Sequence, residues 1–167
     1  MCSLEDAYAF RYSNYDTPFW ARENTNEGRW HKAGDGPTQY LTLHPEGAWA
    51  ELAREEMLHT DAEMALVRTT LWVARVTQGG IVDYSSEEKA AKGGFPFDAL
   101  TNDDQDLCRH HGSSLRERGF TGVLAPSAAL PGATNLTLFG PRLLSGWGEE
   151  PKLAACLPAC VVAVGAP

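Results

Sequence analysis

Apolar and polar positions alternate along much of the chain, and this predicts a series of short β-strands. Aromatic and apolar residues fill positions 7–12, and β-branched and aromatic residues fill positions 38–43, directly after a Gly-Pro turn. Successive side chains of a strand point to opposite faces. We therefore expect Tyr40 and Thr42 on one face of the second strand and Leu41 and Leu43 on the other, so that Tyr40 faces a pocket rather than the main core.

Further strands are expected later in the chain. The strongest apolar run covers residues 69–76 and is predicted to close at Gly79-Gly80, and residues 81–84 fit another short strand. Three more runs have the apolar character of strands, at residues 122–125, 136–139 and 156–164.

Helix signals lie between these runs. Pro45 opens a helix that is expected to continue to about residue 59, with Glu51 on its second turn. Residues 61–67 either extend this helix or start another. The polar residues 13–35 are expected to form a long loop, and long ordered loops are often functional.

Two more helices are predicted in the second half of the chain. Ser85-Ser86 followed by two glutamates starts a helix that ends at Gly93-Gly94, and residues 103–118 form another that ends at Gly119. Strands with helices inserted between them favour the α+β class, with a compact mixed β-sheet core.

Composition narrows the possible functions. The 167 residues, 43% of them hydrophobic, fit a single globular domain over residues 1–167. The chain has neither an apolar run long enough to span a membrane nor a secretory signal at its start, so we expect a cytoplasmic protein. The net charge of −8 argues against a nucleic-acid surface, but a small anionic nucleotide responds to local arginines instead.

The cysteines and histidines give no metal signal. Cys156 and Cys160 form a C-x3-C pair without a second pair at zinc-finger spacing, while Cys2 and Cys108 stand alone. Reduced thiols are the expectation. The chain has no H-E-x-x-H motif and no Gly-x-Gly-x-x-Gly motif, so we expect no metal and no Rossmann-type redox cofactor.

Three candidate site residues, Arg29, Tyr40 and Glu51, follow one another at intervals of eleven positions. The guanidinium suits a phosphate or carboxylate. The flat ring of Tyr40 suits stacking. Glu51 stands between Trp49-Ala50 and Leu52, where a carboxylate is costly unless it has a partner.

A fourth candidate, Ser127, follows Pro126 after a predicted strand, and it lacks the Gly-x-Ser-x-Gly setting of a nucleophile. Ordinary structural roles remain open for Arg29, Tyr40 and Ser127: an arginine lying over Trp30, a half-buried strand tyrosine and a turn serine.

Taken together, these motifs resemble the RES domain family. The resemblance rests on Gly28-Arg29-Trp30, Gly34-Asp35-Gly36-Pro37, Gln39-Tyr40-Leu41, Pro45-Glu46-Gly47-Ala48 leading to Glu51, Gly119-Phe120-Thr121-Gly122-Val123, Pro126-Ser127-Ala128 and Asn135-Leu136-Thr137-Leu138-Phe139. It covers residues 11–139, with a loose match over 61–118. One departure is His31, where the family often has asparagine.

The resemblance implies a bacterial toxin of a toxin–antitoxin pair that destroys NAD, with an ADP-ribosyltransferase-like fold. It implies that Arg29, Tyr40, Glu51 and Ser127 are catalytic, and that Arg11, His31 and Asn135 join Arg29 and Tyr40 in binding the substrate. Arg29 and Arg11 would hold the diphosphate, Tyr40 would stack, and Ser127 would fix the nicotinamide riboside end. Glu51 would stabilise the positive charge that develops on the sugar.

The expected function is therefore cleavage of the nicotinamide–ribose bond, with transfer of ADP-ribose to phosphate or water. NAD would be the substrate and not a cofactor, and an antitoxin is the expected protein partner. Two alternatives remain: an ADP-ribosyltransferase that modifies a protein, and an inactive binding module.

Overall fold

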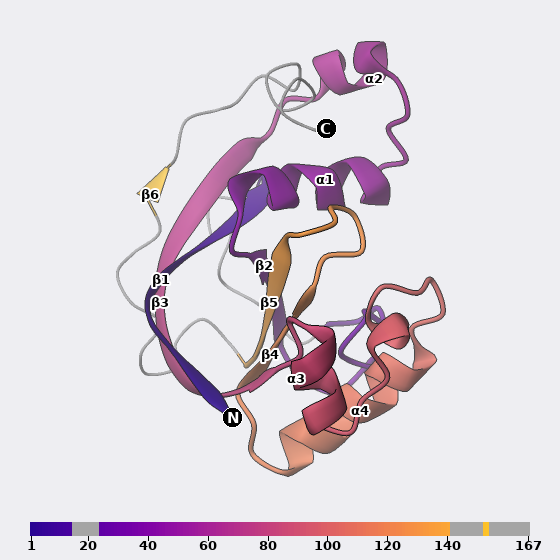
Figure 1. Ribbon diagram of the computed structural model, residues 1–167. Helices are drawn as coiled ribbons and strands as arrows, with labels where there is room; N and C mark the ends of the chain where they lie inside the picture. The colour runs from indigo at the N-terminus through magenta and orange to yellow at the C-terminus, as the bar shows by residue number, and fades with distance from the viewer. Residues whose placement is uncertain (15–23, 141–151, 154–167) are drawn as a thin grey trace.

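The computed structural model describes residues 1–14, 24–140 and 152–153. The strands of these residues are β1 (Cys2–Ser13), β2 (Thr38–Thr42), β3 (Thr70–Asp83), β4 (Gly122–Pro126), β5 (Thr134–Phe139) and β6 (Lys152–Leu153). The helices are α1 (Pro45–Glu55), α2 (Asp61–Leu66), α3 (Glu87–Lys92), the 3-10 helix η1 (Phe97–Leu100) and α4 (Asp106–Glu117). Helix α1 lies near one end of the sheet, and α3 and α4 lie together near the other (Figure 1).

The strand pairings close on themselves. β2 pairs antiparallel with β5, β5 antiparallel with β4, and β4 parallel with β3. β3 then pairs antiparallel with β1 over most of its length, and β1 returns to β2 through the single pair Phe10 and Thr42. The short β6 pairs with β3. The result is a mixed, strongly curved sheet in which β1 and β3 bend around the shorter strands (Figure 1).

The period-two pattern sorts side chains into two apolar clusters. Leu41, Leu124 and Leu136 join the cluster inside the curved sheet, together with Ala9, Ala74, Val76, Ile81 and Leu138. The residues that alternate with them face α3 and α4, where Val123, Ala125 and Phe139 pack with Trp30, Tyr84, Ala90, Phe95, Leu100, Cys108 and Leu115. Leu41 therefore lies in the first cluster, and Tyr40 packs against the second, as the alternation predicts.

The expectation that Gly79-Gly80 closes a strand is wrong. β3 runs through both glycines as one strand from Thr70 to Asp83. The register against β1 shifts between Leu4–Gln78 and Cys2–Ile81, and Gly80 adopts a φ of +77°. The pair forms a bulge, which bends a strand instead of ending it. Beyond the bulge, residues 81–83 of β3 pair in parallel with β4.

Other boundaries also differ from expectation. α1 ends at Glu55, not near residue 59, because Met57 turns into a left-handed conformation with φ +52° and Leu58 N–H closes the end on the Ala53 carbonyl at 2.8 Å. α2 is a separate helix that begins with a capping box between Thr60 and Glu63. β1 begins at Cys2, earlier than expected. The strand expected at 156–164 lies outside the described residues.

The remaining predicted helices are present, although α4 begins at Asp106 instead of residue 103. Pro45 is the first residue of α1, and the Ser86 hydroxyl accepts a hydrogen bond from Lys89 N–H at the start of α3. The described part of the chain contains no helix that is both long and apolar enough to cross a membrane.

Helix α4 approaches the segment around Trp30 so closely that Gly112 has no space for a side chain. A Cβ atom at Gly112 would lie 2.2 Å from the Trp30 carbonyl oxygen. We expect Gly112→Ala to destabilise the fold by about 1–3 kcal/mol, although alanine is the better helix former by about 1 kcal/mol. Urea unfolding measures this change. Glu117→Ala, at the exposed end of α4, is the control, and an equal or higher stability for Gly112→Ala would contradict the packing.

Candidate functional site

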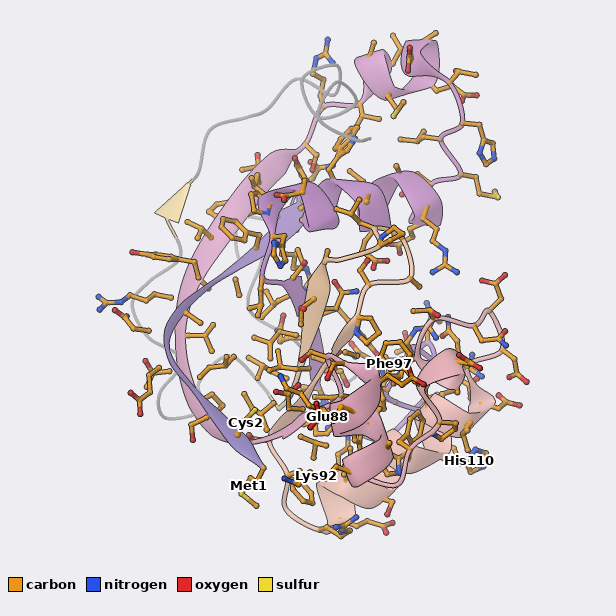
Figure 2. The ribbon with its side chains drawn as sticks, in the orientation of Figure 1. Met1, Cys2, Glu88, Lys92, Phe97 and His110 are labelled. Carbon is orange, nitrogen blue, oxygen red and sulfur yellow. The ribbon has the colours of Figure 1, made fainter. Side chains whose placement is uncertain are left out.

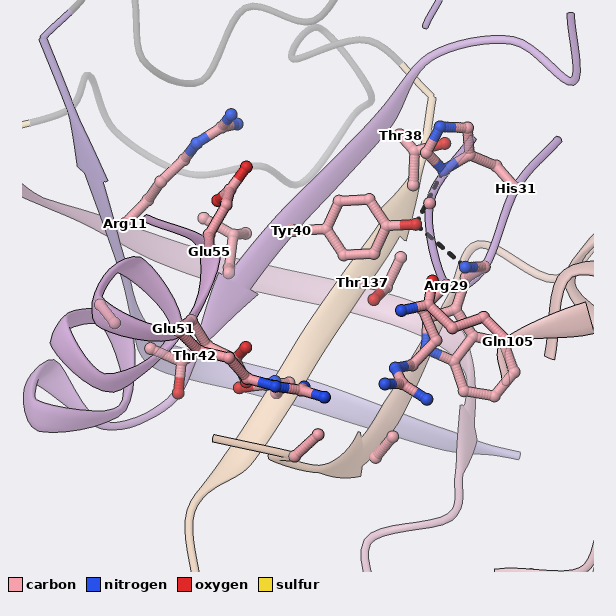
Figure 3. A pocket seen from close by; sticks show the side chains of 18 of the residues that line it. Arg11, Arg29, His31, Thr38, Tyr40, Thr42, Glu51, Glu55, Gln105 and Thr137 are labelled. Carbon is pink, nitrogen blue, oxygen red and sulfur yellow. Dashed lines mark hydrogen bonds between the residues drawn. The ribbon is translucent and has the colours of Figure 1, made fainter. Parts of the chain in front are cut away.

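A pocket of about 900 Å³ lies between α1, the β2–β5–β4 part of the sheet and the segment 24–31. This volume falls within the range of small-molecule sites. β1 contributes Arg11, α1 contributes Glu51, Arg54 and Glu55, and the residue before α4 contributes Gln105. Figure 3 shows Tyr40 between two groups of side chains, with Arg11, Glu51 and Glu55 on one side and Arg29, His31 and Gln105 on the other.

Strand register builds the floor of this pocket. Tyr40 of β2 lies opposite Thr137 of β5, and Thr42 lies opposite Asn135. Asn135 in turn lies opposite Ala125 of β4. All five residues line the pocket. Three neighbouring strands thus present a phenol, two hydroxyls and an amide on the face that the sequence pattern assigned to Tyr40.

Glu51 is the carboxylate over this floor, and one of its oxygens is fixed from two directions. Its Oε1 accepts hydrogen bonds from the Ser127 hydroxyl and from Asn135 Nδ2, each at 2.6 Å. The Ser127 oxygen itself accepts from the backbone N–H groups of Ala129 and Leu130, at 3.1 and 3.0 Å. Among the described residues, the other oxygen, Oε2, has no hydrogen-bond partner. The partner that the apolar setting of Glu51 required is therefore present.

Arg29 is presented by a tight turn. Gly28 and His31 form an isolated antiparallel bridge, with Gly28 N–H on the His31 carbonyl at 3.1 Å. Arg29 and Trp30 occupy the tip, where Trp30 enters the aromatic cluster under α4 and Arg29 lines the pocket. A Cβ atom at Gly28 would lie 2.5 Å from His31 Cε1 and 2.6 Å from the Tyr40 hydroxyl, so only glycine fits there.

The Tyr40 hydroxyl joins this turn to the sheet. It accepts from Trp30 N–H at 3.0 Å and lies 2.7 Å from His31 Nδ1. His31 Nε2 lies 2.9 Å from the carbonyl oxygen of Asn26, which can only accept. Nε2 therefore carries the proton, and in the neutral imidazole Nδ1 accepts from the Tyr40 hydroxyl. Figure 3 shows the hydroxyl pointing to His31.

Burial keeps this chain of groups neutral. It raises the pKa of Tyr40 well above its ordinary value and lowers the pKa of His31, which is 4% exposed. Both ring nitrogens of His31 are engaged by the protein. The prediction that His31 binds substrate stays a prediction, and its present contacts hold Tyr40 and the turn.

Each of the three arginines that line the pocket has a partner elsewhere in the protein. Arg29 Nη1 donates to the Asn102 carbonyl at 2.8 Å. Arg11 Nη1 donates at 2.8 Å to Oε1 of Gln39, which is fully buried. Arg54, which the sequence reasoning missed, forms an ion pair with Asp103. Its position one helical turn after Glu51 was the available signal.

Six of the seven residues singled out from the sequence line one pocket: Arg11, Arg29, His31, Tyr40, Glu51 and Asn135. Ser127 does not line this pocket. Its side chain is buried, with 4% exposure, and contacts Glu51. The prediction that it contacts nicotinamide stays untested, and its hydroxyl is occupied by Glu51 and two backbone N–H groups.

Within residues 1–14, 24–140 and 152–153, no three His, Cys, Asp or Glu side chains are grouped to hold a metal ion. On α4, His110 projects outward (Figure 2), whereas His111 forms a hydrogen bond with the Tyr84 hydroxyl at 2.7 Å and packs on Phe95.

Fold and pocket together define a mixed α/β protein whose sheet-dominated core carries a nucleotide-sized polar site. The RES domain model matches residues 6–149, and the chain belongs to the RES domain family.

The known proteins that are similar to the chain include two from Mycobacterium tuberculosis. The chain is 31% identical over 138 residues to a probable NAD(+) phosphorylase of Mycobacterium tuberculosis, in a match that covers 78% of this chain and 66% of that protein. The chain thus spans slightly less than two thirds of that relative's length. A chain of the M. tuberculosis MbcT–MbcA toxin–antitoxin complex shares the fold, with a TM-score of 0.75 and 20% identity, covering 96% of this chain and 88% of that one.

Because the pKa of His31 is lowered in the folded state, the stability of the fold should depend on pH. The unfolded chain takes up a proton on this histidine near its ordinary pKa of about 6.5, whereas burial in the folded state opposes that proton. The contribution of His31 is therefore fully present above pH 6.5 and is lost as the pH falls toward the folded pKa. We expect His31→Asn to lose less stability than the parent between pH 7.5 and pH 5.

Urea unfolding at several pH values measures this difference. His31→Asn also removes two hydrogen bonds, so its stability at pH 7.5 should be lower by about 1–3 kcal/mol. His110→Asn, at an exposed position of α4, is the control and should follow the parent. Parallel pH curves for the parent and His31→Asn would contradict a buried neutral imidazole.

Proposed function

We propose that this chain consumes NAD by cleaving the bond between nicotinamide and ribose, and that it transfers ADP-ribose to phosphate or water. The observation that carries the proposal is Glu51, a carboxylate with one oxygen fixed by Ser127 and Asn135 and the other available in a nucleotide-sized pocket. The whole chain would serve as one catalytic domain, with an architecture like that of ADP-ribosyltransferases.

The chemistry needs a fixed negative charge beside the sugar. As the C1′–N bond breaks, its electron pair goes to the nicotinamide ring, which leaves as a neutral molecule, and positive charge develops on the ribose. A carboxylate that is already oriented stabilises this charge without reorganising during the reaction. The leaving group is cationic before cleavage, so no general acid is required, unlike in ordinary glycoside hydrolysis.

The other residues of the pocket supply binding. The guanidinium groups of Arg29 and Arg11 lie on opposite sides of Tyr40 (Figure 3) and would contact the diphosphate. The Tyr40 ring lines the pocket and would stack against the substrate. Ser127 and Asn135 are best understood as positioning residues, because both donate hydrogen bonds to Glu51.

The relatives support this proposal. The M. tuberculosis protein that is 31% identical is named a probable NAD(+) phosphorylase, which favours phosphate as the acceptor. The similar structure comes from a toxin–antitoxin complex, which favours a toxin with an antitoxin partner. In this setting NAD is a substrate, and its loss would harm the cell that contains the free toxin.

One enzymatic alternative is transfer of ADP-ribose to a protein side chain, because the same cleavage precedes either transfer. Labelled ADP-ribose that remains on a protein, with little free product, would favour it. An inert binding module is the other alternative, and the partnered carboxylate of Glu51 argues against it.

The role of Glu51 gives the first functional prediction. Glu51→Gln keeps the size of the side chain but removes its charge, and we expect the rate of NAD consumption to fall by about 10²–10³. Glu56→Gln, on the exposed turn just after α1, is the matched control and should retain the parent rate. A Glu51→Gln variant that is folded by circular dichroism and consumes NAD at the parent rate would remove Glu51 from the chemistry.

The second functional prediction concerns the acceptor of ADP-ribose. NAD consumption should rise with phosphate concentration, and mass spectrometry should detect ADP-ribose that carries an additional phosphate. In this reaction a phosphate oxygen forms the new bond to C1′ as nicotinamide leaves. A rate that is insensitive to phosphate, with plain ADP-ribose as the product, would instead identify water as the acceptor.

A further inference from the structure

Arg54 is a pocket residue that the proposed function does not yet use. It lies three residues after Glu51 on α1, and both side chains line the pocket. Residues three apart on a helix are neighbours on one face, separated by about 4.5 Å along the axis. A group bound to Arg54 would therefore lie beside the carboxylate that faces the sugar.

A second cation of the pocket, Arg29, is tied to the same short segment as Arg54. Arg54 forms its ion pair with the Asp103 carboxylate, and Arg29 Nη1 donates to the carbonyl of Asn102, the preceding residue, at 2.8 Å. The two guanidinium groups are thus tied to consecutive residues of the segment that precedes α4. They come from opposite walls of the pocket, α1 and the turn at residues 28–31.

The ion pair between Arg54 and Asp103 is of the kind that a ligand can replace. The Asp103 side chain is 92% exposed and that of Arg54 is 38% exposed, and exposed ion pairs contribute little to stability. Asp103 does not line the pocket. A carboxylate and a phosphate offer a guanidinium the same kind of paired acceptor oxygens, so a phosphate can compete with Asp103 for Arg54.

We propose that Arg54 and Arg29 form a phosphate-binding subsite beside Glu51, and that Asp103 competes with the ligand for Arg54. The proposal rests on the proposed function for its biological meaning, since a phosphate held there is placed to attack C1′. The ligand is a phosphate group, which can come from inorganic phosphate as the acceptor or from the diphosphate of the nucleotide. Glu51 and Glu55 also line this region, and two cations offset their repulsion of an anion.

The test is calorimetric titration of the 167-residue chain with inorganic phosphate and, separately, with ADP-ribose. Arg54→Gln should weaken binding of at least one of them about tenfold, in line with the loss of a charge-assisted contact. Asp103→Asn removes the competitor and should tighten the same ligand by about two- to fivefold. In the double variant this gain should disappear, because the released guanidinium is absent.

Arg68→Gln is the matched control, since Arg68 is exposed and donates to the carbonyls of Ala65 and Val67. If the substitutions change the affinity for inorganic phosphate, the subsite binds the phosphate acceptor. If they change only the affinity for ADP-ribose, the subsite binds the diphosphate of the nucleotide. Unchanged affinity for both ligands in Arg54→Gln and in Asp103→Asn would overturn the subsite. Asp103→Asn alters only an exposed side chain, so it remains informative if Arg54→Gln does not fold.

The titrations do not depend on turnover, so the subsite and the proposed function fail separately. If the parent leaves NAD intact but phosphate affinity follows Arg54 and Asp103 as expected, the subsite stands without the proposed reaction. If NAD is consumed while neither substitution changes either affinity, the reaction stands without the subsite.

Discussion

The pocket depends on the hydroxyl of Tyr40, which joins the two walls of the site. Tyr40 belongs to the sheet, and its hydroxyl holds both Trp30 N–H and the His31 ring of the turn that carries Arg29. The same turn is pressed against α4 at Gly112 and against Tyr40 at Gly28, where no side chain fits. The position of Arg29 relative to the sheet therefore follows from one buried, neutral hydrogen-bond network.

Electrostatics divides the pocket into fixed and adjustable groups. Glu51 is fixed, because Ser127 and Asn135 both donate to one of its oxygens. Arg29 donates to a backbone carbonyl, and Arg54 pairs with an exposed carboxylate, which an anionic ligand would replace in the proposed subsite. A rigid negative charge beside adjustable positive charges suits a reaction in which a cationic sugar must be stabilised while phosphate groups enter and leave.

Much of this arrangement could be predicted from local sequence signals. The alternation of side chains predicted that Tyr40 and Thr42 lie on one face of their strand and Leu41 on the other. The apolar neighbours of Glu51 indicated that its carboxylate needs a hydrogen-bonding partner. Pro45 marked the start of α1. These properties depend on residues close together in the chain, so the sequence reports them directly. The family motifs indicated that Arg29, Tyr40 and Glu51 belong together, which single-residue patterns could not do.

The remainder depends on contacts between distant segments. Nothing near Gly79-Gly80 distinguishes a turn from a bulge, because the outcome is decided by the pairing of β3 with β1 and β4. The use of Ser127 to orient Glu51, and the pairing of Arg54 with Asp103, join residues far apart in the chain. The role of His31 likewise follows from its distance to Tyr40 and not from its neighbours in the sequence.

The central claim is that Glu51 acts on the nicotinamide-bearing ribose, and a crystal structure of the Glu51→Gln variant with intact NAD tests it most directly. The ribose C1′ should lie beside the side chain of residue 51, with phosphate oxygens in contact with Arg29 and the substrate packed on Tyr40. NAD bound elsewhere, or bound in this pocket with its nicotinamide riboside end away from residue 51, would contradict the claim.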